Sequence, residues 1–374
     1  MFELLDGAPQ NAVIKVIGVG GGGGNAVQHM LRQGVEGVEF IAANTDAQAL
    51  KTIDVRTTLH IGGEITKGLG AGADANVGRQ AALEDRDRIE EVLRGADMVF
   101  ITAGMGGGTG TGAAPVIAQI AKEAGILTVA VVTRPFRFER RDKVAEQGVA
   151  ELANIVDSLI TIPNEKLLSV YGERCTMLEV FAHADDVLLG AVQGIADLII
   201  RPGHLNVDFA DVRTVMAAMG VAMMGTGRAS GDNRARVATE EAIHSPLLDD
   251  VNLQGARGIL VNITAGPSLN IGEFTEVGNI IDEFASPDAT VIIGTAFDPE
   301  MTDEIKVTVV ATGLGSSAAL SVAVDNTNAR SAQQIGRGGA EIDWDVPSYK
   351  RTSRGPKEDK DLLDVPAFLR NQAS

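Results

Sequence analysis

Two glycine-rich stretches are the residues in this sequence whose type and spacing could do chemistry. The first, Gly18–Gly24, follows an apolar run at Val13–Val19 and precedes a helical pattern. The second, Gly104–Gly112, follows another apolar run at Met98–Thr102. A turn from a strand into a helix presents backbone N–H groups and the positive end of the helix dipole, which together bind anions. Glycine lets that backbone approach a phosphate without a Cβ in the way, so both stretches predict phosphate cradles.

The first stretch alone leaves the kind of ligand open. Gly18, Gly20 and Gly23 satisfy G-x-G-x-x-G, the dinucleotide-binding pattern, in which Glu39 or Asp46 would hold the ribose. The alternative is a tight turn that binds no ligand. Ordering five consecutive glycines loses much backbone entropy, however, and the packing of a turn alone does not explain that cost. Two cradles at one sheet edge exceed the needs of a single pyrophosphate. They favour a nucleoside triphosphate held from both sides.

Three further observations refine this nucleotide hypothesis. Thr109 and Thr111 add hydroxyl donors to the second glycine stretch. The segment Gly68–Ala73 either closes over the outer phosphate or is a mobile surface loop. The pattern G-x-x-x-x-G-K-[ST] does not occur, so the sequence is not that of a P-loop nucleotidase.

An acidic pair in Asn206-Val207-Asp208-Phe209-Ala210-Asp211 has two interpretations. Asp208 can cap the next helix, with Asp211 in the third helical position of a capping box. The same spacing also brings both carboxylates near one helix end, where they can hold a water between them. The two roles are compatible, because a capping residue can still face a ligand.

The apolar pattern predicts an α/β protein with a doubly wound, mostly parallel sheet. Its strands alternate with helices and include Val38–Ala43, Ile126–Val132 and Leu159–Ile162 besides those that precede the glycines. Apolar residues at spacings of three and four predict a long central helix over Thr176–Ile200, roughly 37 Å in length. A second αβ module follows, with helices at 208–219, 233–243 and 273–284 and strands at 258–264, 289–295 and 304–311.

The composition excludes several classes of protein. A formal net charge of −18 over 374 residues repels phosphate backbones, so nucleic acid is not an expected partner. The single Cys175 fits a reducing cytosol. The first residues lack the pattern of a signal peptide, and no apolar run reaches the length of a membrane span, so direct membrane insertion is not expected. The histidines are scattered without metal-ligand spacing, so we expect no protein metal site.

We expect the chain to divide into a nucleotide-binding domain, a central helix, a second domain and a tail. Residues from about 326 to 360 are polar and lack an apolar period, which is typical of a disordered linker. The predicted segments are an N-terminal extension at 1–10, the nucleotide domain at 11–175, the helix at 176–203, the second domain at 204–316, the linker at 317–360 and a partner-binding peptide at 361–374.

Four motifs together resemble the FtsZ family of tubulin-like cell-division GTPases. They are Gly20–Asn25, Asn44-Thr45-Asp46, the G-G-G-T-G-T-G run within Gly104–Gly112, and Asn206–Asp211. The glycine-threonine run is the signature of the tubulin superfamily and is highly specific. The resemblance extends from about Asn11 to Gly315 and returns in the final peptide.

The resemblance implies GTP or GDP as ligand, with Mg²⁺ carried on the phosphates. Asn25 and Asp185 would read guanine, although Asp185 by itself would be interpreted as part of a solvated helix face. Glu139 would hold the ribose, and either Arg141 or Lys143 would supply the basic contact after it. The implied nucleotide-binding residues are Gly21, Gly22, Gly23, Gly24, Asn25, Asn44, Ala71, Gly72, Gly104, Gly106, Gly107, Gly108, Thr109, Gly110, Thr133, Glu139, Arg141, Phe181 and Asp185.

The resemblance also implies a head-to-tail filament in the cytoplasm, at the mid-cell division ring. Asn206, Asp208 and Asp211 of one subunit would then act on the nucleotide of the next. The tail residues Leu363, Val365, Phe368 and Leu369 would bind the membrane tethers FtsA and ZipA and regulators of ring position. Two rival hypotheses are an NAD-dependent Rossmann-type dehydrogenase, which leaves the second glycine stretch without a role, and a tubulin-like filament without GTP turnover.

Overall fold

The computed structural model describes residues 12–172, 175–201, 207–217, 220–248 and 255–314. Asn206, the predicted linker and the terminal peptide lie outside the described residues. The strands are β1 (Ile14–Val19), β2 (Val38–Asn44), β3 (Thr57–His60), β4 (Met98–Gly104), β5 (Leu127–Arg134), β6 (Ser158–Pro163), β7 (Gly220–Ser230), β8 (Gly258–Ala265), β9 (Thr290–Phe297) and β10 (Glu304–Leu314).

The helices alternate with these strands through the first half of the chain. They are α1 (Gly20–Arg32), α2 (Ala47–Leu50), α3 (Gly63–Thr66), α4 (Ala75–Glu84), α5 (Arg86–Leu93), α6 (Thr109–Glu123), the 3₁₀ helix η1 (Arg137–Glu139), α7 (Asp142–Ala153), α8 (Asn164–Tyr171), α9 (Met177–Ile200), α10 (Phe209–Met216), α11 (Arg234–Ile243) and α12 (Ile271–Phe284).

The described strands form one sheet in the order β3-β2-β1-β4-β5-β6-β7-β10-β8-β9. The pairs from β3 to β7 are parallel, β10 is antiparallel to both β7 and β8, and β9 is parallel to β8. The predicted doubly wound, mostly parallel sheet is therefore confirmed. The strand order reverses between β1 and β4, and Val19 is level with Ala103 there. Parallel sheets bind ligands at such a switch point, beyond the carboxyl ends of the strands.

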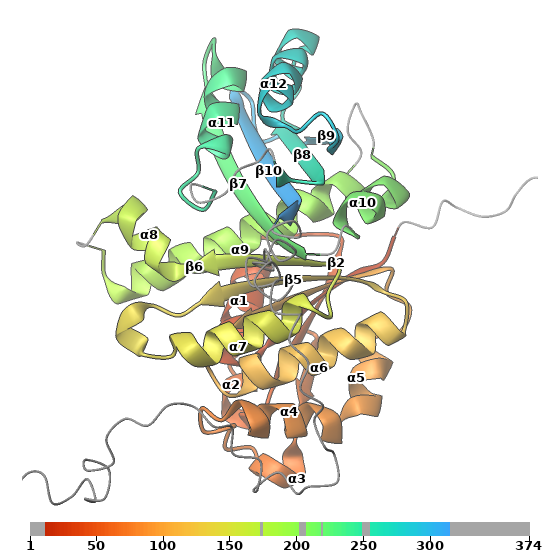
Figure 1. Cartoon of the computed structure of the whole chain (residues 1–374), viewed down its shortest axis with the longest axis vertical. Helices are drawn as coiled ribbons and strands as arrows, with labels where there is room; N and C mark the ends of the chain where they lie inside the picture. The colour runs from red at the N-terminus through yellow and green to blue at the C-terminus, as the bar shows by residue number, and fades with distance from the viewer. Residues whose placement is uncertain (1–11, 173–174, 202–206, 218–219, 249–254, 315–374) are drawn as a thin grey trace, which may run out of the picture. The chain divides into compact units, whose positions relative to one another are not determined.

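Helices cover both faces of the parallel part of the sheet (Figure 1). One apolar core joins α4, α5, α6 and α7 to side chains such as Ile17 and Val99, and a second joins α1, α9 and α10 to the opposite side chains, such as Val16 and Phe100. Since successive residues of a strand point to opposite faces, a continuous apolar run supplies both cores. None of the helices in the described part of the chain is long and apolar enough to cross a bilayer.

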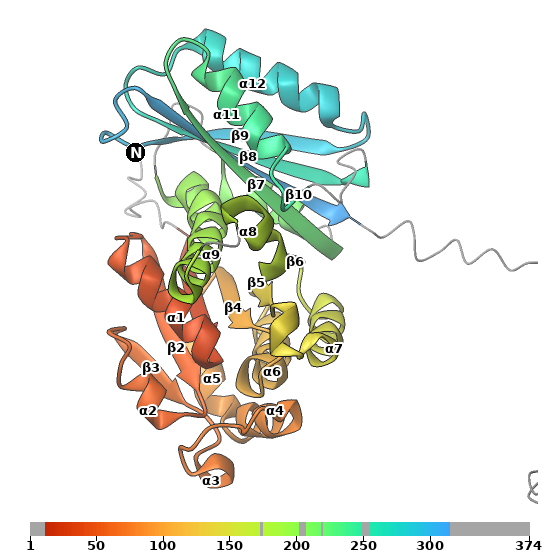
Figure 2. The ribbon, with the colours of Figure 1, turned by 90° about the vertical axis from the view of Figure 1, so that its left-hand side faces the viewer.

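The long helix α9 lies between the two halves of the molecule, as predicted (Figure 2). It begins after Thr176, whose hydroxyl accepts from the backbone N–H of Glu179 in a capping box. Its apolar stripe packs against β5 and β6 on one side and against Met224 and Val310 of the second module on the other. The remaining face of the second module packs against α11 and α12. A stripe wide enough for two partners explains why the second half of this helix is mostly buried, from Ala191 to Leu198.

The sequence pattern did not predict β3, β7, the helices α2, α3, α4, α5, α7 and α8, or the 3₁₀ helix η1. The omission of β7 has a clear cause, since its residues are mostly small and its two central glycines lack β propensity. A Cβ at Gly225 or Gly227 would overlap carbonyl oxygens of α11, so close packing of this helix requires glycine there. Pairing of β7 with both β6 and β10 joins the two modules into one sheet.

Candidate nucleotide site

A cavity of about 510 Å³ lies at the carboxyl ends of β1, β4 and β5. Both glycine stretches, the end of η1 and the first half of α9 contribute to its wall. Its lining residues are Val19, Gly21, Gly22, Asn25, Gly104, Met105, Gly107, Gly108, Thr109, Gly110, Thr133, Pro135, Glu139, Arg141, Asn164, Phe181, Ala184, Asp185 and Leu188.

The glycines of the first stretch have two different physical roles. They form the first turn of α1, whereas the sequence analysis expected the helix to begin at Asn25. A Cβ at Gly23 would overlap the carbonyl oxygen of Thr102 in β4, so this position packs backbone against backbone. A Cβ at Gly21 meets nothing within 4 Å and would project into open space at the cavity wall.

The second stretch repeats this division. A Cβ at Gly110 would lie 2.6 Å from the carbonyl oxygen of Gly104, whereas one at Gly107 meets nothing within 4 Å. Both stretches therefore leave open space where backbone N–H groups at the starts of α1 and α6 converge. That space fits a phosphate chain, because bare N–H groups and helix dipoles favour anions.

At the opposite wall, α9 contributes Asp185, Phe181 and Ala184. Burial raises the pKa of Asp185 to about 6; the His29 charge opposes this shift and Asp186 adds to it. His29 pairs with Asp186 at 2.7 Å, and Asp186 is not part of the cavity lining. The burial of Asp185 does not fit a solvated helix face, which is how the residue would be interpreted without the family resemblance. A half-buried carboxylate here can accept two hydrogen bonds from a ligand edge.

Glu139 and Arg141 both line the cavity. Glu139 Oε1 accepts from the backbone N–H of Phe136 at 2.9 Å, which fixes the short 3₁₀ turn. Phe136 in turn packs edge-on against Phe181 at 5.5 Å between ring centroids. Arg141 precedes α7 and lines the cavity, while Lys143 does not. Of the two alternatives left open by the sequence, the geometry favours Arg141.

Six predicted residues do not line this cavity: Gly23, Gly24, Asn44, Ala71, Gly72 and Gly106. Gly23 and Gly24 face the protein interior, and a Cβ at Gly24 would meet Ile53. Ala71 lies under the second stretch, where a Cβ at Gly108 would come 2.9 Å from it. Asn44 accepts from the N–H of Asp46 at 3.2 Å and so shapes the neighbouring turn.

The sequence analysis missed Val19, Met105, Pro135, Asn164, Ala184 and Leu188. Asn164 is the most informative of these. It is 4% exposed, and its Oδ1 is buried without a hydrogen-bond partner among the described residues. A buried acceptor without a partner costs about 1–3 kcal/mol, and a ligand donor in the cavity would remove that cost. Its position directly after the strand predicted at Leu159–Ile162 was the available signal, since ligands bind beyond strand ends.

The acidic pair lies outside this cavity. Asp208 accepts from the backbone N–H of Asp211 at 2.8 Å and caps α10, and both side chains are exposed. Arg213 of the same helix donates to the carbonyl of Gly125 at 2.8 Å. Gly125 follows the C-terminal end of α6, whereas the cavity lies at the N-terminal end. Because α6 has 15 residues, about 22 Å separates its ends.

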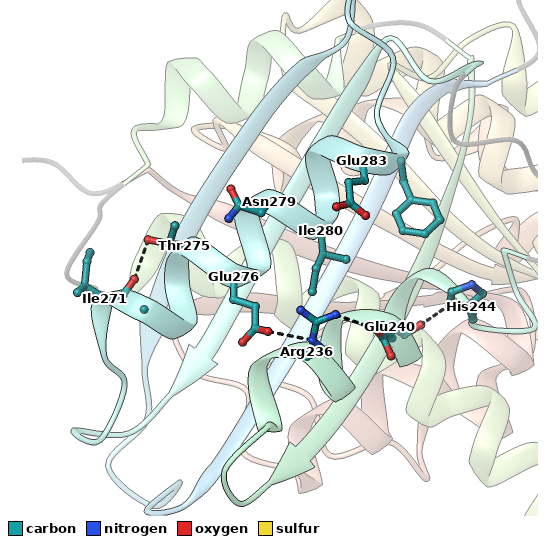
Figure 3. Close-up of a pocket in the computed structure, with 11 residues that line it drawn as sticks. Arg236, Glu240, His244, Ile271, Thr275, Glu276, Asn279, Ile280 and Glu283 are labelled. Carbon is teal, nitrogen blue, oxygen red and sulfur yellow. Dashed lines mark hydrogen bonds and ion pairs between the residues drawn. The ribbon is translucent and has the colours of Figure 1, made fainter.

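A second cavity, of about 710 Å³, lies between α11 and α12 (Figure 3). Arg236 bridges it by pairing with Glu276 at 3.0 Å and with Glu240 at 3.7 Å. Its other lining residues include Glu283, and no glycine turn at a strand end reaches it. This cavity is larger than the first but is not suited to a nucleotide. Its lining carries three carboxylates and one arginine, and this excess of negative charge repels phosphate.

Two family models match the chain. The GTPase domain of the Tubulin/FtsZ family matches residues 13–172, and the C-terminal domain of the FtsZ family matches residues 220–315. The chain belongs to the FtsZ family. The cell division protein FtsZ of Pseudomonas aeruginosa is 64% identical over 393 aligned residues, and that of Azotobacter vinelandii is 62% identical over 393; both alignments cover all of both chains.

Solved structures agree with this family assignment. An empty FtsZ dimer from M. jannaschii has a TM-score of 0.78 and 41% identity, covering 83% of this chain and 90% of that one. The GDP-bound CetZ1 monomer from Haloferax volcanii, at 21% identity, has a TM-score of 0.71 and shares the fold, covering 81% of this chain and 95% of that one. The chain is thus a tubulin-like GTPase, and the dehydrogenase alternative is not supported.

A glycine that lines the cavity and a glycine that packs against backbone should respond differently to an added methyl group. Gly21→Ala should leave the free energy of unfolding within about 0.5 kcal/mol of the parent and weaken GTP binding at least tenfold, because its methyl enters the phosphate space. Gly23→Ala should lower the free energy of unfolding by about 1–3 kcal/mol. Denaturant unfolding without nucleotide, and fluorescence titration with GTP, measure the two effects. Wild-type affinity in Gly21→Ala would contradict this assignment.

The raised pKa of Asp185 predicts pH-dependent guanine binding. The carboxyl is protonated below about pH 6 and then cannot accept both guanine N–H groups, so affinity falls as the pH drops through 6. Between pH 7 and pH 5 the ionised fraction falls about tenfold, and affinity for GDP should fall with it. Asp185→Asn is the control, because in this variant only the nucleotide itself titrates over this pH range. The variant should also shift the binding preference from guanine toward xanthine nucleotides. An unchanged pH profile in that variant would refute the role of this carboxylate.

Proposed function

We propose that this protein hydrolyses GTP only after head-to-tail assembly, in a site shared between two subunits. The observation that carries the proposal is the separation of the phosphate cradle from the acidic pair. The cradle lies at one end of α6, and α10, with Asp208 and Asp211, lies at the other end. One chain therefore cannot bring its own acids to its own phosphates. A second copy placed end to end can, and a repeated contact of this heterologous kind produces a filament.

Each end of the subunit would contribute different chemistry to this site. Gly21, Gly22, Gly107 and Gly108 bind the phosphates through backbone N–H groups, and Thr109 adds a hydroxyl. Mg²⁺ would come with the nucleotide and would neutralise part of the charge on its phosphates. Asp208 and Asp211 of the neighbour, with Asn206 beside them in sequence, orient and polarise the attacking water. Phosphoryl transfer requires mainly such positioning and charge stabilisation.

The base would be read at the α9 wall. An ionised Asp185 accepts from N1–H and the 2-amino group of guanine, and Asn25 and Asn164 supply further polar contacts. Phe181 offers an aromatic edge next to the base. Adenine lacks both donors and would leave the carboxylate unpaired in a half-buried place, which disfavours ATP.

Concentration dependence of phosphate release tests the shared site. Specific activity should be near zero below a threshold protein concentration and should rise above it. Asp211→Ala should bind GTP normally, assemble and lose at least 100-fold in turnover. Asp87→Ala is the matched control, because Asp87 is an exposed acid in the first turn of α5 and should leave turnover unchanged. A specific activity that stays constant on dilution would contradict the proposal. Wild-type filaments that bind GTP but release no phosphate would favour the alternative hypothesis of a filament that does not turn over GTP.

We also propose that the terminal peptide recruits the filament to the cytoplasmic membrane surface at mid-cell. Pro366 is suited to the first position of a short helix, which would place Leu363, Val365, Phe368 and Leu369 toward a partner groove. The expected partners are the tethers FtsA and ZipA and regulators of ring position. Phe368→Ala in the full chain should abolish binding to a purified tether and leave GTP hydrolysis unchanged. Equal tether affinity of the two proteins would overturn the assignment.

A further inference from the structure

A buried pair of hydroxyl groups lies beside the phosphate cradle. Thr45 follows the last residue of β2 and is 0% exposed. Its Oγ1 lies 2.6 Å from Oγ1 of Thr109, the first residue of α6 and a lining residue of the nucleotide cavity. The two residues are 64 positions apart in sequence, so the fold alone creates this contact.

Each hydroxyl has a single hydrogen, so only one member of the pair can donate to the other. A phosphate oxygen is an acceptor only. If the Thr109 hydroxyl donates its hydrogen to a bound phosphate, the bond between the two hydroxyls must run from Thr45 to Thr109. The hydrogen of the Thr45 hydroxyl then points toward the Thr109 oxygen. The bound state thus contains a directed chain from Thr45 through Thr109 to the nucleotide. Such chains strengthen each bond by mutual polarisation, most of all when the terminal acceptor is charged.

Thr45 is well suited to hold this direction because its backbone is fixed on both sides. Its carbonyl oxygen accepts from the backbone N–H of Gly70 at 3.2 Å. The preceding residue, Asn44, accepts from the N–H of Asp46, which caps α2. The hydroxyl of Thr45 is therefore free to serve Thr109, while its main chain anchors the loop that runs past the cradle.

We propose that Thr45 is a positioning residue that orients the Thr109 hydroxyl toward the nucleotide phosphates. Thr45 does not line the cavity, and it acts only through Thr109. This inference rests on the proposed function, since it requires a phosphate at the start of α6. The proposal gives Thr45, the middle residue of Asn44-Thr45-Asp46, a role in ligand binding in addition to its role in packing.

The test removes only the hydroxyl. Thr45→Val replaces the hydroxyl by a methyl and leaves the backbone contact with Gly70 in place. It should weaken GDP and GTP binding about three- to tenfold in a fluorescence titration. Thr45→Ser keeps the hydroxyl and should restore affinity to within twofold of wild type. At saturating GTP, and above the assembly threshold, the turnover of Thr45→Val should stay within twofold of wild type, because an orienting contact acts on binding.

A matched control comes from a second hydroxyl pair. Thr308 of β10 is 1% exposed, and its Oγ1 lies 3.4 Å from Oγ1 of Thr226 in β7. Neither residue lines the nucleotide cavity. Thr308→Val should cost comparable thermal stability without changing nucleotide affinity. A double-mutant cycle adds Thr109→Val, in whose background Thr45→Val should cost nothing further.

The outcomes separate the two proposals. Wild-type affinity in Thr45→Val, equal losses in Thr45→Ser and Thr45→Val, or an equal loss in Thr308→Val would each overturn the inference and leave the nucleotide site intact. Additive losses in the cycle would do the same. Absence of GDP and GTP binding by the wild-type protein would instead overturn the proposed function. If Thr45→Val fails to unfold cooperatively, Thr45→Ala carries the same comparison with Thr45→Ser.

Discussion

The structure depends on the close approach of two polypeptide backbones where β1 and β4 pass into α1 and α6. Gly23 lies against the carbonyl of Thr102, and Gly20 lies against the backbone nitrogen of Gly110, with no space for a side chain at either contact. This packing brings the N-terminal ends of two helices to one point of the sheet. The charge of a phosphate is favoured there because both helix dipoles and several N–H groups converge on it. Every other part of the site is arranged around this point.

The central helix α9 connects that site to the second module. Its first half presents Asp185 and Phe181 to the cavity, and its second half packs under β7, β8 and β10. A buried hydrogen bond from Asn262 to the carbonyl of Gly194, at 2.9 Å, fixes its position against the second module. Burial raises the pKa of Asp197 on the same helix, and Arg201 opposes the shift. This helix therefore carries both a carboxylate that lines the cavity and the packing interface with the second module.

The length of α6 sets the distance between the glycine turns and the acidic pair within one chain. Its N-terminus forms the cradle and its C-terminal end touches α10, so the helix holds the two halves of the chemistry apart. In the proposed shared site, this separation would keep one chain from hydrolysing its own nucleotide. Contact between copies would complete the site and would so couple turnover to assembly.

The sequence by itself determined the doubly wound fold, the long helix and the two phosphate-binding turns, because apolar periodicity and runs of glycine are local signals. It also placed Asp208 as a helix cap, since capping depends on neighbouring residues. Tertiary structure alone decided that β7 joins the two modules, that Asn164 and Asp185 share one cavity, and that Thr45 meets Thr109. These contacts join residues far apart in the chain, and a pattern of neighbours contains no information on which distant backbone or side chain will fill a given space.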